Sequence, residues 1–306
     1  MGGRGRLGSS TAATCAAYDE EWMNMAIVVT AASGQLGRLV VEALLQRGVA
    51  ADEVLATARD TARLADLAER GVRTARLDYD DVDASVLSAG DVLLLVSSSA
   101  VGRRTQQHRN VVEAARAAGV ARVAYTSAPA ADTSPLVVAP EHKETEELLR
   151  ASGLPVTLLR NGWYTENYQP AFAQARATGR IAAAAGDGRV ASVERAELAE
   201  AAAVVLTTEG HEGAVLELVG QEAWSHAELA AAFAEVLGTE VAYDALPADE
   251  YRQVLLGAGL DEGTVGFLLA ADANIADGVL APTGDDLARV LGRAPRTLRQ
   301  TVATWA

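Results

Sequence analysis

The segment Ser33-Gly34-Gln35-Leu36-Gly37 is the part of this sequence best suited to hold a negatively charged group. It lies between an apolar run, Ala26 to Thr30, and an amphipathic run over 35–47. A strand followed by glycines and a helix presents backbone N–H groups and the positive end of the helix dipole to a phosphate. We therefore expect a phosphate-binding loop made by Ala31, Ala32, Ser33, Gly34, Gln35 and Leu36.

Ala31 departs from the usual fingerprint, which has a glycine at this position. Its methyl group can narrow the turn if the backbone there needs a positive φ. The alanine therefore puts the affinity of the loop for a cofactor in question, but not the fold. An ordinary strand-to-helix turn that binds no nucleotide is the alternative.

Arg59 follows the second apolar run, in Leu55-Ala56-Thr57-Ala58-Arg59-Asp60, with Arg63 one helical turn later. In dinucleotide-binding βαβ units an acidic side chain here binds the ribose 2′-hydroxyl of NAD, whereas arginine accommodates the 2′-phosphate of NADP. The sequence therefore favours NADPH, and Asp60 leaves NADH open. Asp78, after the third run, is a candidate partner for the adenine amino group.

These residues need a parallel sheet to position them, and the first half of the chain predicts one. From Ala26, short apolar runs alternate with longer helical ones, which indicates parallel strands with right-handed crossovers. We predict strands over 26–30, 53–57, 72–77, 92–96, 122–126 and 156–159. Helices are predicted over 35–47, 60–70, 82–89, 103–118 and 141–152.

The rhythm changes after Arg160, where a loop rich in aromatic and amide side chains precedes mostly helical sequence. Helices are expected near 169–178, 194–208, 225–237 and 247–258, with short strands near 214–219 and 240–243. The first of these strands could extend the main sheet. We therefore expect a Rossmann-type doubly wound α/β domain over 25–160 and a smaller, mostly helical substrate-binding lid over 161–306, with some segments returning to the main sheet.

Composition excludes several classes of protein. The 306 residues carry a formal net charge of −15, which argues against a nucleic-acid surface. The single Cys15 and the lack of a secretion signal fit a reducing cytoplasm. No apolar run is long enough to cross a membrane. Residues 1–24 have neither helical nor strand periodicity, so we expect a disordered leader or an upstream misassignment of the start codon.

Several longer motifs resemble one family. They include Leu94-Leu95-Val96-Ser97-Ser98-Ser99, Gln107-His108-Arg109-Asn110-Val111, Tyr125-Thr126-Ser127 and Leu159-Arg160-Asn161-Gly162-Trp163-Tyr164-Thr165-Glu166-Asn167-Tyr168. Over residues 25–306 the chain resembles the NmrA-like branch of the atypical short-chain dehydrogenases/reductases, and within it the bacterial NAD(P)H:quinone oxidoreductases of the second type.

The resemblance implies a nicotinamide laid across the carboxyl ends of the strands, where open parallel sheets bind ligands. The loops expected to touch it contain Ser97, Ser98, Ser99, Thr126, Ser127, Asn161, Trp163 and Tyr164. It implies hydride transfer from NADPH to a quinone or a similar activated acceptor. Neither a metal nor a flavin is expected, and metal-ligand spacing is absent from the sequence.

The carbonyl chemistry of ordinary short-chain dehydrogenases needs a tyrosine with a lysine four residues later. Tyr125 is followed at that spacing by Pro129, and Tyr164 by Tyr168. Quinone reduction demands less, because the anion formed is already stable and hydrogen-bond donors suffice. Asn161, Tyr164 and His142 are the candidate donors; His142 takes the place that a lysine has in isoflavone reductases. Trp163 and Tyr168 offer flat faces for the acceptor.

Two other functions remain open. A non-catalytic NmrA-like sensor that binds NADP(H) fits the missing tyrosine–lysine pair. A tailoring reductase acting on an aromatic polyketide quinone would use the same site. The expected partner is a small quinone-like molecule, and a homodimer is left open.

Overall fold

Seven parallel strands form the main sheet of the computed structural model, which describes residues 25–306. Their order is β3-β2-β1-β4-β5-β6-β9. The strands are β1 (Ile27–Val29), β2 (Val54–Ala58), β3 (Arg73–Arg76), β4 (Val92–Leu95), β5 (Arg122–Ser127), β6 (Val156–Asn161) and β9 (Val215–Leu218). The order reverses between β1 and β4, which creates a crevice at the carboxyl ends of these strands. The predicted Rossmann-type sheet is confirmed.

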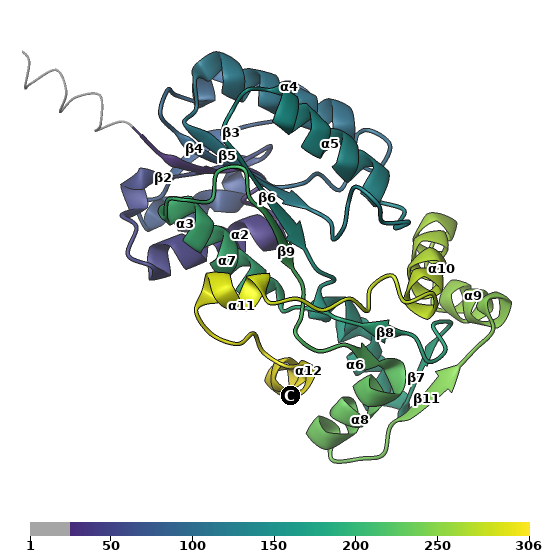
Figure 1. The fold of residues 1–306 in the computed structure, drawn as a ribbon. Coiled ribbons are helices and arrows are strands. Elements are labelled where there is room, and N and C mark those ends of the chain that lie inside the picture. The colour runs from purple at the N-terminus through teal and green to yellow at the C-terminus, as the bar shows by residue number, and fades with distance from the viewer. Residues whose placement is uncertain (1–24) are drawn as a thin grey trace, which may run out of the picture.

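Helices cover both faces of this sheet (Figure 1). One face is covered by α4 (Arg104–Ala118) and α5 (Ala139–Ala151), and the other by α2 (Gln35–Gln46), α3 (Ala65–Glu69), α7 (Arg195–Thr207) and α11 (Asp286–Leu291). Two apolar clusters fill the spaces between the layers. The central strands are therefore buried on both sides, which explains their uninterrupted apolar sequence.

The predicted helix over 82–89 is wrong. Only a 3₁₀ turn, Ala84–Val86, occurs there. The Asp83 carboxylate accepts a hydrogen bond from the backbone N–H of Ser85 at 2.9 Å, and the Asp91 carboxylate accepts one from Ser88 at 2.8 Å. Such local side-chain bonds satisfy the backbone without a helix. The run predicted as a helix over 60–70 likewise divides into a 3₁₀ turn, Thr61–Leu64, and the short α3.

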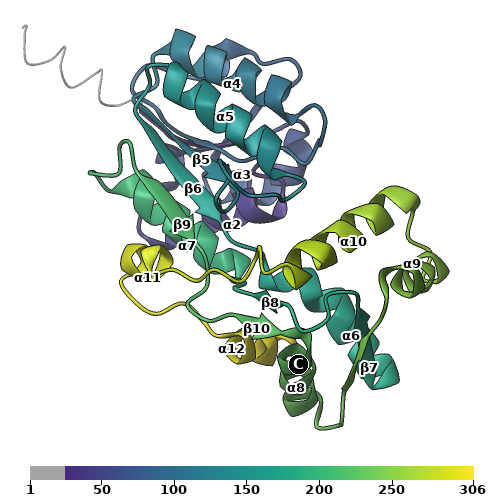
Figure 2. The same ribbon diagram turned by 45° about the vertical axis from the view of Figure 1, so that its right-hand side comes forward.

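The second half of the chain forms a smaller body next to the carboxyl ends of the main strands (Figures 1 and 2). Its helices are α6 (Gln169–Thr178), α8 (His226–Leu237), α9 (Ala248–Gly257), α10 (Glu262–Ala276) and α12 (Leu298–Val302). Two small sheets pair β7 (Arg180–Ala183) with β11 (Ala242–Ala245), and β8 (Arg189–Val190) with β10 (Trp224–Ser225). A third apolar cluster packs this body.

Three segments of the second half return to the main sheet, one of them α11, which packs against α7 and β9. Strand β9 pairs with β6, as the prediction near 214–219 allowed, and α7 packs beside α2. Helix α10 was not predicted. The expected leader, 1–24, lies outside the described residues. Among the helices that the structure describes, none is long and apolar enough to cross a membrane.

Candidate active site

The loop after β1 has the geometry of a phosphate site. The backbone N–H groups of Gln35, Leu36 and Gly37, at the start of α2, have no partner among the described residues. A Cβ on Gly37 would lie 2.5 Å from the carbonyl oxygen of Ala31, which is too close for any side chain. Glycine at position 37 therefore allows the start of α2 to pack against the loop after β1. Free N–H groups at a helix N-terminus favour an anion.

Ala31 adopts a φ of +49°, in the left-handed region where an alanine is strained. Its carbonyl accepts the Gly34 N–H at 2.9 Å and closes the turn. The sequence raised the question whether a methyl group at Ala31 narrows the turn. The structure shows that Ala31 does stand at a position with positive φ, where the usual fingerprint has glycine.

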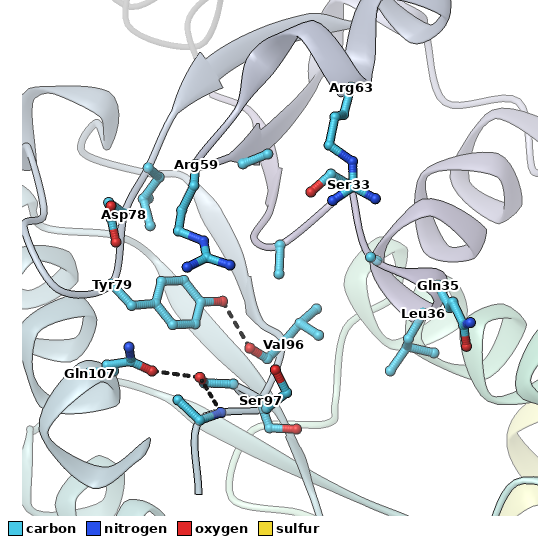
Figure 3. A pocket seen from close by; sticks show the side chains of 18 of the residues that line it. Ser33, Gln35, Leu36, Arg59, Arg63, Asp78, Tyr79, Val96, Ser97 and Gln107 are labelled. Carbon is cyan, nitrogen blue, oxygen red and sulfur yellow. Dashed lines mark hydrogen bonds between the residues drawn. The ribbon is translucent and has the colours of Figure 1, made fainter. Parts of the chain in front are cut away.

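A groove of about 650 Å³ extends from this loop across the carboxyl ends of β1, β2 and β4 (Figure 3). Most of the predicted cofactor residues line it: Ala31, Ser33, Gly34, Gln35, Leu36, Arg59, Asp78, Ser97, Ser98 and Ser99. Arg59 and Arg63 bring positive charge to one part of the groove, and neither guanidinium forms an ion pair within residues 25–306. The groove therefore suits a phosphorylated dinucleotide.

Three predicted cofactor residues lie elsewhere. Ala32 is fully buried in the core. Thr126 is buried beneath the loop, where its Oγ1 accepts the Ser97 N–H at 2.8 Å. Ser127 lines a different cavity, and its hydroxyl donates to Glu146 at 2.6 Å. Thr126 therefore supports the loop that lines the groove, while Ser127 belongs to the neighbouring cavity.

Tyr79 forms part of the groove and was not predicted. Its hydroxyl donates to the carbonyl oxygen of Val96 at 2.8 Å and also contacts the hydroxyl of Thr30. Burial raises the pKa of Tyr79, so the phenol stays neutral. The ring joins the ends of β1 and β4 across the crevice. Its place directly after Asp78 was the only signal in the sequence.

A second cavity, of about 850 Å³, adjoins the groove. Four residues line both spaces: Gln35, Ser97, Tyr164 and Arg195. The predicted residues His142, Asn161, Trp163 and Tyr164 all line this cavity, although they come from α5, from the end of β6 and from the loop after it. The structure thus brings together side chains that the sequence spreads over more than twenty residues.

His142 is held by Tyr125 at one edge of the cavity. Its Nδ1 lies 2.7 Å from the Tyr125 hydroxyl. Burial lowers the pKa of His142 to about 3, and burial raises the pKa of Tyr125, so both groups are neutral near pH 7. The pair is satisfied when Tyr125 donates to Nδ1, which leaves the proton of His142 on Nε2.

His108 lies behind this pair and has a structural role. Its Nε2 accepts the Ser98 N–H at 2.9 Å, and its Nδ1 lies 3.0 Å from the Thr145 hydroxyl. The imidazole packs edge-on against Tyr125, with ring centroids 5.4 Å apart. His108 thereby joins the groove loop to α5. Lys143, the residue after His142, is exposed.

Aromatic side chains form the outer wall of the second cavity. The rings of Trp163 and Phe267 lie nearly parallel, at an interplanar angle of 19° with centroids 6.5 Å apart. Phe267 is on α10 and is 41% exposed, unusually accessible for its size. It was missed because α10 was not predicted. Asn161 ends β6 with a buried Oδ1 that has no partner among the described residues.

Tyr168 does not reach the cavity wall. Its ring is buried below the cavity, edge-on to Trp224 at 4.8 Å and to His226 at 5.6 Å. The predicted contact with a substrate therefore has no support in the geometry. The 3₁₀ turn Thr165–Tyr168 directs the side chain into the core of the smaller body.

Within residues 25–306, no group of three or more histidine, cysteine, aspartate or glutamate side chains could hold a metal ion. The sheet crevice, the helix N-terminus and the two arginines instead define a nucleotide-binding α/β protein of the Rossmann type with an adjoining ligand cavity. A family model described as NAD(P)H-binding matches residues 31–209, and the chain belongs to this family.

Known proteins resemble the whole described chain. Quinone oxidoreductase 2 of Escherichia coli (strain K12) is 43% identical over 90% of this chain and 97% of that protein. The crystal structure of the NADPH-dependent quinone oxidoreductase from Escherichia coli complexed with NADPH has a TM-score of 0.87 and 42% identity, covering 91% of this chain and 99% of that one. Citrobacter sp. triphenylmethane reductase complexed with NADP(H) has a TM-score of 0.87 and 35% identity, covering 92% and 100%. The resemblance inferred from the motifs is confirmed.

Proposed function

We propose that this chain is an NADPH-dependent oxidoreductase that transfers a hydride to a quinone or a similar activated aromatic acceptor. One observation carries the proposal: the dinucleotide groove and the second cavity share Gln35, Ser97, Tyr164 and Arg195. A cofactor in the groove and an acceptor in the cavity therefore meet at these residues. The likeness to a quinone oxidoreductase along nearly the whole chain supports the same activity.

The groove fits NADPH better than NADH. The N–H groups at the start of α2 can hold the pyrophosphate, and Arg59 and Arg63 can hold the 2′-phosphate. Ser97, Ser98 and Ser99 line the groove and can contact the nicotinamide half. When bound, the cofactor supplies the hydride, and the protein supplies orientation and polarity.

Hydrogen-bond donors face the acceptor. The Nε2–H of His142 can donate to an acceptor oxygen, because Tyr125 occupies the other ring nitrogen. Asn161 and Tyr164 line the same cavity, and their amide and hydroxyl groups are further candidate donors. Fixed donors of this kind stabilise negative charge that appears on an oxygen during reaction.

Trp163 and Phe267 favour a planar acceptor. Their nearly parallel rings offer flat apolar faces on the outer wall of the cavity. Aromatic faces bind flat rings by stacking, at about 0.5–1.5 kcal/mol per pair beyond the area buried. A quinone, which is flat, polarised and electron-poor, matches both the walls and the donors.

The decisive experiment follows the absorbance of reduced nicotinamide in the purified chain, with a panel of benzoquinones, naphthoquinones and enones. We expect NADPH oxidation that depends on the quinone, with a lower KM for NADPH than for NADH. The control is the same protein with an aliphatic ketone, which should not be reduced. Tight NADPH binding without turnover of any acceptor would reject the enzyme and favour a sensor of cofactor redox state.

A further inference from the structure

Arg195 lies where the two cavities meet. It is the first residue of α7 and lines both the groove and the second cavity. Its guanidinium carbon lies 4.6 Å from the centre of the Tyr164 ring, within the range of a cation–π contact. Its backbone N–H donates to both carboxylate oxygens of Glu166, at 2.9 and 3.1 Å. Arg195 is therefore held through its backbone N–H and through the ring of Tyr164, beside the expected site of reaction.

The guanidinium of Arg195 has no hydrogen bond or ion pair with any residue in 25–306. Other shielded arginines of this protein are paired: Arg160 with Glu146 at 2.7 Å, and Arg104 with the carbonyl oxygen of Ser98 at 2.6 Å. The carboxylate of Glu166 accepts a hydrogen bond from the backbone N–H of Arg195 and forms no ion pair with its guanidinium. A half-buried cation with five free N–H donors in a strongly acidic protein is well suited to an anionic ligand.

Arg195 is the one basic side chain that lines the second cavity in the described chain, apart from His142. His142 is neutral because burial lowers its pKa to about 3. The charged side chains that line the cavity are therefore Arg195 and Glu166. Both carboxylate oxygens of Glu166 accept the backbone N–H of Arg195, which leaves the guanidinium free for a ligand. Arg59 and Arg63, by contrast, line only the groove.

Building on the proposed function, we propose that Arg195 is a catalytic residue that binds the negative charge formed on the acceptor. A neutral quinone that accepts a hydride gains two electrons and one proton, and so carries one negative charge. NADPH is oxidised in the same step, and one proton from solvent then completes the hydroquinone. A fixed guanidinium within the cavity lowers the energy of this anion without needing to be deprotonated.

A rival role is binding of the dinucleotide pyrophosphate, because Arg195 also borders the groove near Gln35. The two roles differ in which ligand loses affinity when the charge is removed. An anionic aromatic ligand should lose affinity if Arg195 serves the acceptor, whereas NADP⁺ should lose it if Arg195 serves the cofactor.

The test compares naphthalene-2-carboxylate with the neutral naphthalene-2-carboxamide, titrated calorimetrically into the NADP⁺-saturated protein. We expect the wild-type chain to bind the carboxylate about tenfold or more tightly than the amide, as a charge-assisted hydrogen bond allows. Arg195→Gln should abolish this preference while the dissociation constant of NADP⁺ changes by less than about twofold. Arg195→Lys should keep part of it, since the charge remains but the planar fork is lost.

Arg109→Gln removes an exposed charge on α4 and serves as the matched control. This variant should still bind the carboxylate more tightly than the amide. Circular dichroism and NADP⁺ binding report whether each variant is folded. In turnover with a quinone, kcat of Arg195→Gln should fall about 10- to 100-fold.

A wild-type protein without preference for the carboxylate would overturn the proposal. So would an Arg195→Gln variant that keeps the preference but binds NADP⁺ weakly. The binding readout does not require turnover, so a protein that reduces no quinone but shows the Arg195-dependent preference would reject the proposed function and retain the anion site.

Discussion

The hydroxyl of Tyr125, on the central strand β5, lies 2.7 Å from Nδ1 of His142, on α5. This hydrogen bond fixes the orientation of the imidazole, because the phenol is buried and stays protonated. Tyr125 is therefore a positioning residue that acts through His142. Its hydroxyl has no tyrosine–lysine chemistry to perform, since Pro129 stands where the lysine would be.

Removing the Tyr125 hydroxyl should weaken the proposed reaction without unfolding the protein. In Tyr125→Phe the Nδ1 of His142 loses its partner, and the imidazole can then adopt the tautomer with its proton on Nδ1. We expect kcat to fall about tenfold while the KM for NADPH is unchanged. Steady-state kinetics check this. A Tyr125→Phe variant with unaltered kcat, or one as inactive as His142→Ala, would contradict the positioning role.

Stability should fall in acid because of three buried histidines. Burial lowers the pKa of His108 and His142 to about 3 and that of His226 to about 4, from 6.5 in the unfolded chain. Below the unfolded value the unfolded state binds more protons, so stability present above pH 6.5 is lost as the pH falls. Thermal melts at pH 7.5 and 5.0 should show a lower Tm at pH 5.0.

His226→Phe should reduce this acid sensitivity, because His226 packs among Trp224, Tyr168 and Tyr243 without a partner for its Nδ1. A control, His211→Gln, changes a histidine that is less buried. Equal Tm differences between the two pH values in His226→Phe and the wild type would contradict the assignment.

Asp272 should destabilise the protein at neutral pH. Burial raises the pKa of this carboxyl group on α10 to about 6. Because this pKa is higher in the folded than in the unfolded chain, the folded state binds the proton more tightly. The free energy of unfolding therefore rises as the pH falls through 6, and this contribution is lost at higher pH. In the wild-type chain the Ala184 N–H donates to the Asp272 carboxylate at 2.6 Å. Asp272→Asn keeps an oxygen that can accept this hydrogen bond but removes the buried charge. We expect a gain of about 1–3 kcal/mol at pH 8 and little change at pH 4.5. Denaturant unfolding at both pH values measures this, and a gain that is equal at both would reject the explanation.

Arg59 should discriminate between the two nicotinamide cofactors. It lines the groove at the end of β2 without an ion pair in the described chain. Arg59→Ala removes a partner of the 2′-phosphate, so the dissociation constant for NADPH should rise about 10- to 100-fold, and that for NADH less than about threefold. Fluorescence titration gives both constants. Equal losses for the two cofactors would refute the placement of the 2′-phosphate at Arg59.

Replacing Ala31 by glycine should relieve backbone strain in the phosphate loop. The left-handed conformation costs an alanine about 1 kcal/mol, part of which the greater unfolded-state freedom of glycine offsets. We expect Ala31→Gly to raise the Tm slightly and to bind NADPH at least as tightly. Ala130→Gly is the matched control, because Ala130 has a φ of +45° but lies outside the groove. Weaker NADPH binding in Ala31→Gly would show that the strained alanine aids the ligand.

Phe267 should influence the choice of acceptor more than the rate with the best one. Phe267→Ala removes one flat face of the second cavity, and the KM for naphthoquinones should rise about threefold to tenfold relative to that for benzoquinone. Val254→Ala, an exposed apolar residue of α9, is the control. Parallel changes for large and small quinones would argue against a role of Phe267 in acceptor binding.

The strands of the main sheet could be predicted because burial on both faces leaves a plain apolar signature in runs such as Val92–Leu95. Helix α10 could not. Its apolar residues, among them Val265, Phe267 and Ile275, are spread around the helix together with two glycines, so no amphipathic period marks it. Since Phe267 is on that helix, the cavity wall opposite Trp163 was also missed.

Arg195 was missed for a different reason. Its importance depends on Tyr164, more than thirty residues earlier, which lies beside it because Tyr164 and Val193 form a parallel bridge. A single arginine at the start of a helix has no local signal that separates it from a surface charge. Groove residues such as Gly34 and Arg59, by contrast, were predictable because strand ends and glycine loops have fixed positions in this fold.

The hairpin of α9 and α10 contributes Phe267 and Leu268 to the second cavity and no residue to the dinucleotide groove. This part of the cavity wall is thus encoded in a stretch of the gene that supplies nothing to the groove. Mutations in the hairpin can broaden or redirect the range of acceptors while the cofactor requirement is inherited unchanged. Directed evolution towards new aromatic compounds can accordingly begin at Phe267 and Leu268, whose substitution leaves the groove lining intact.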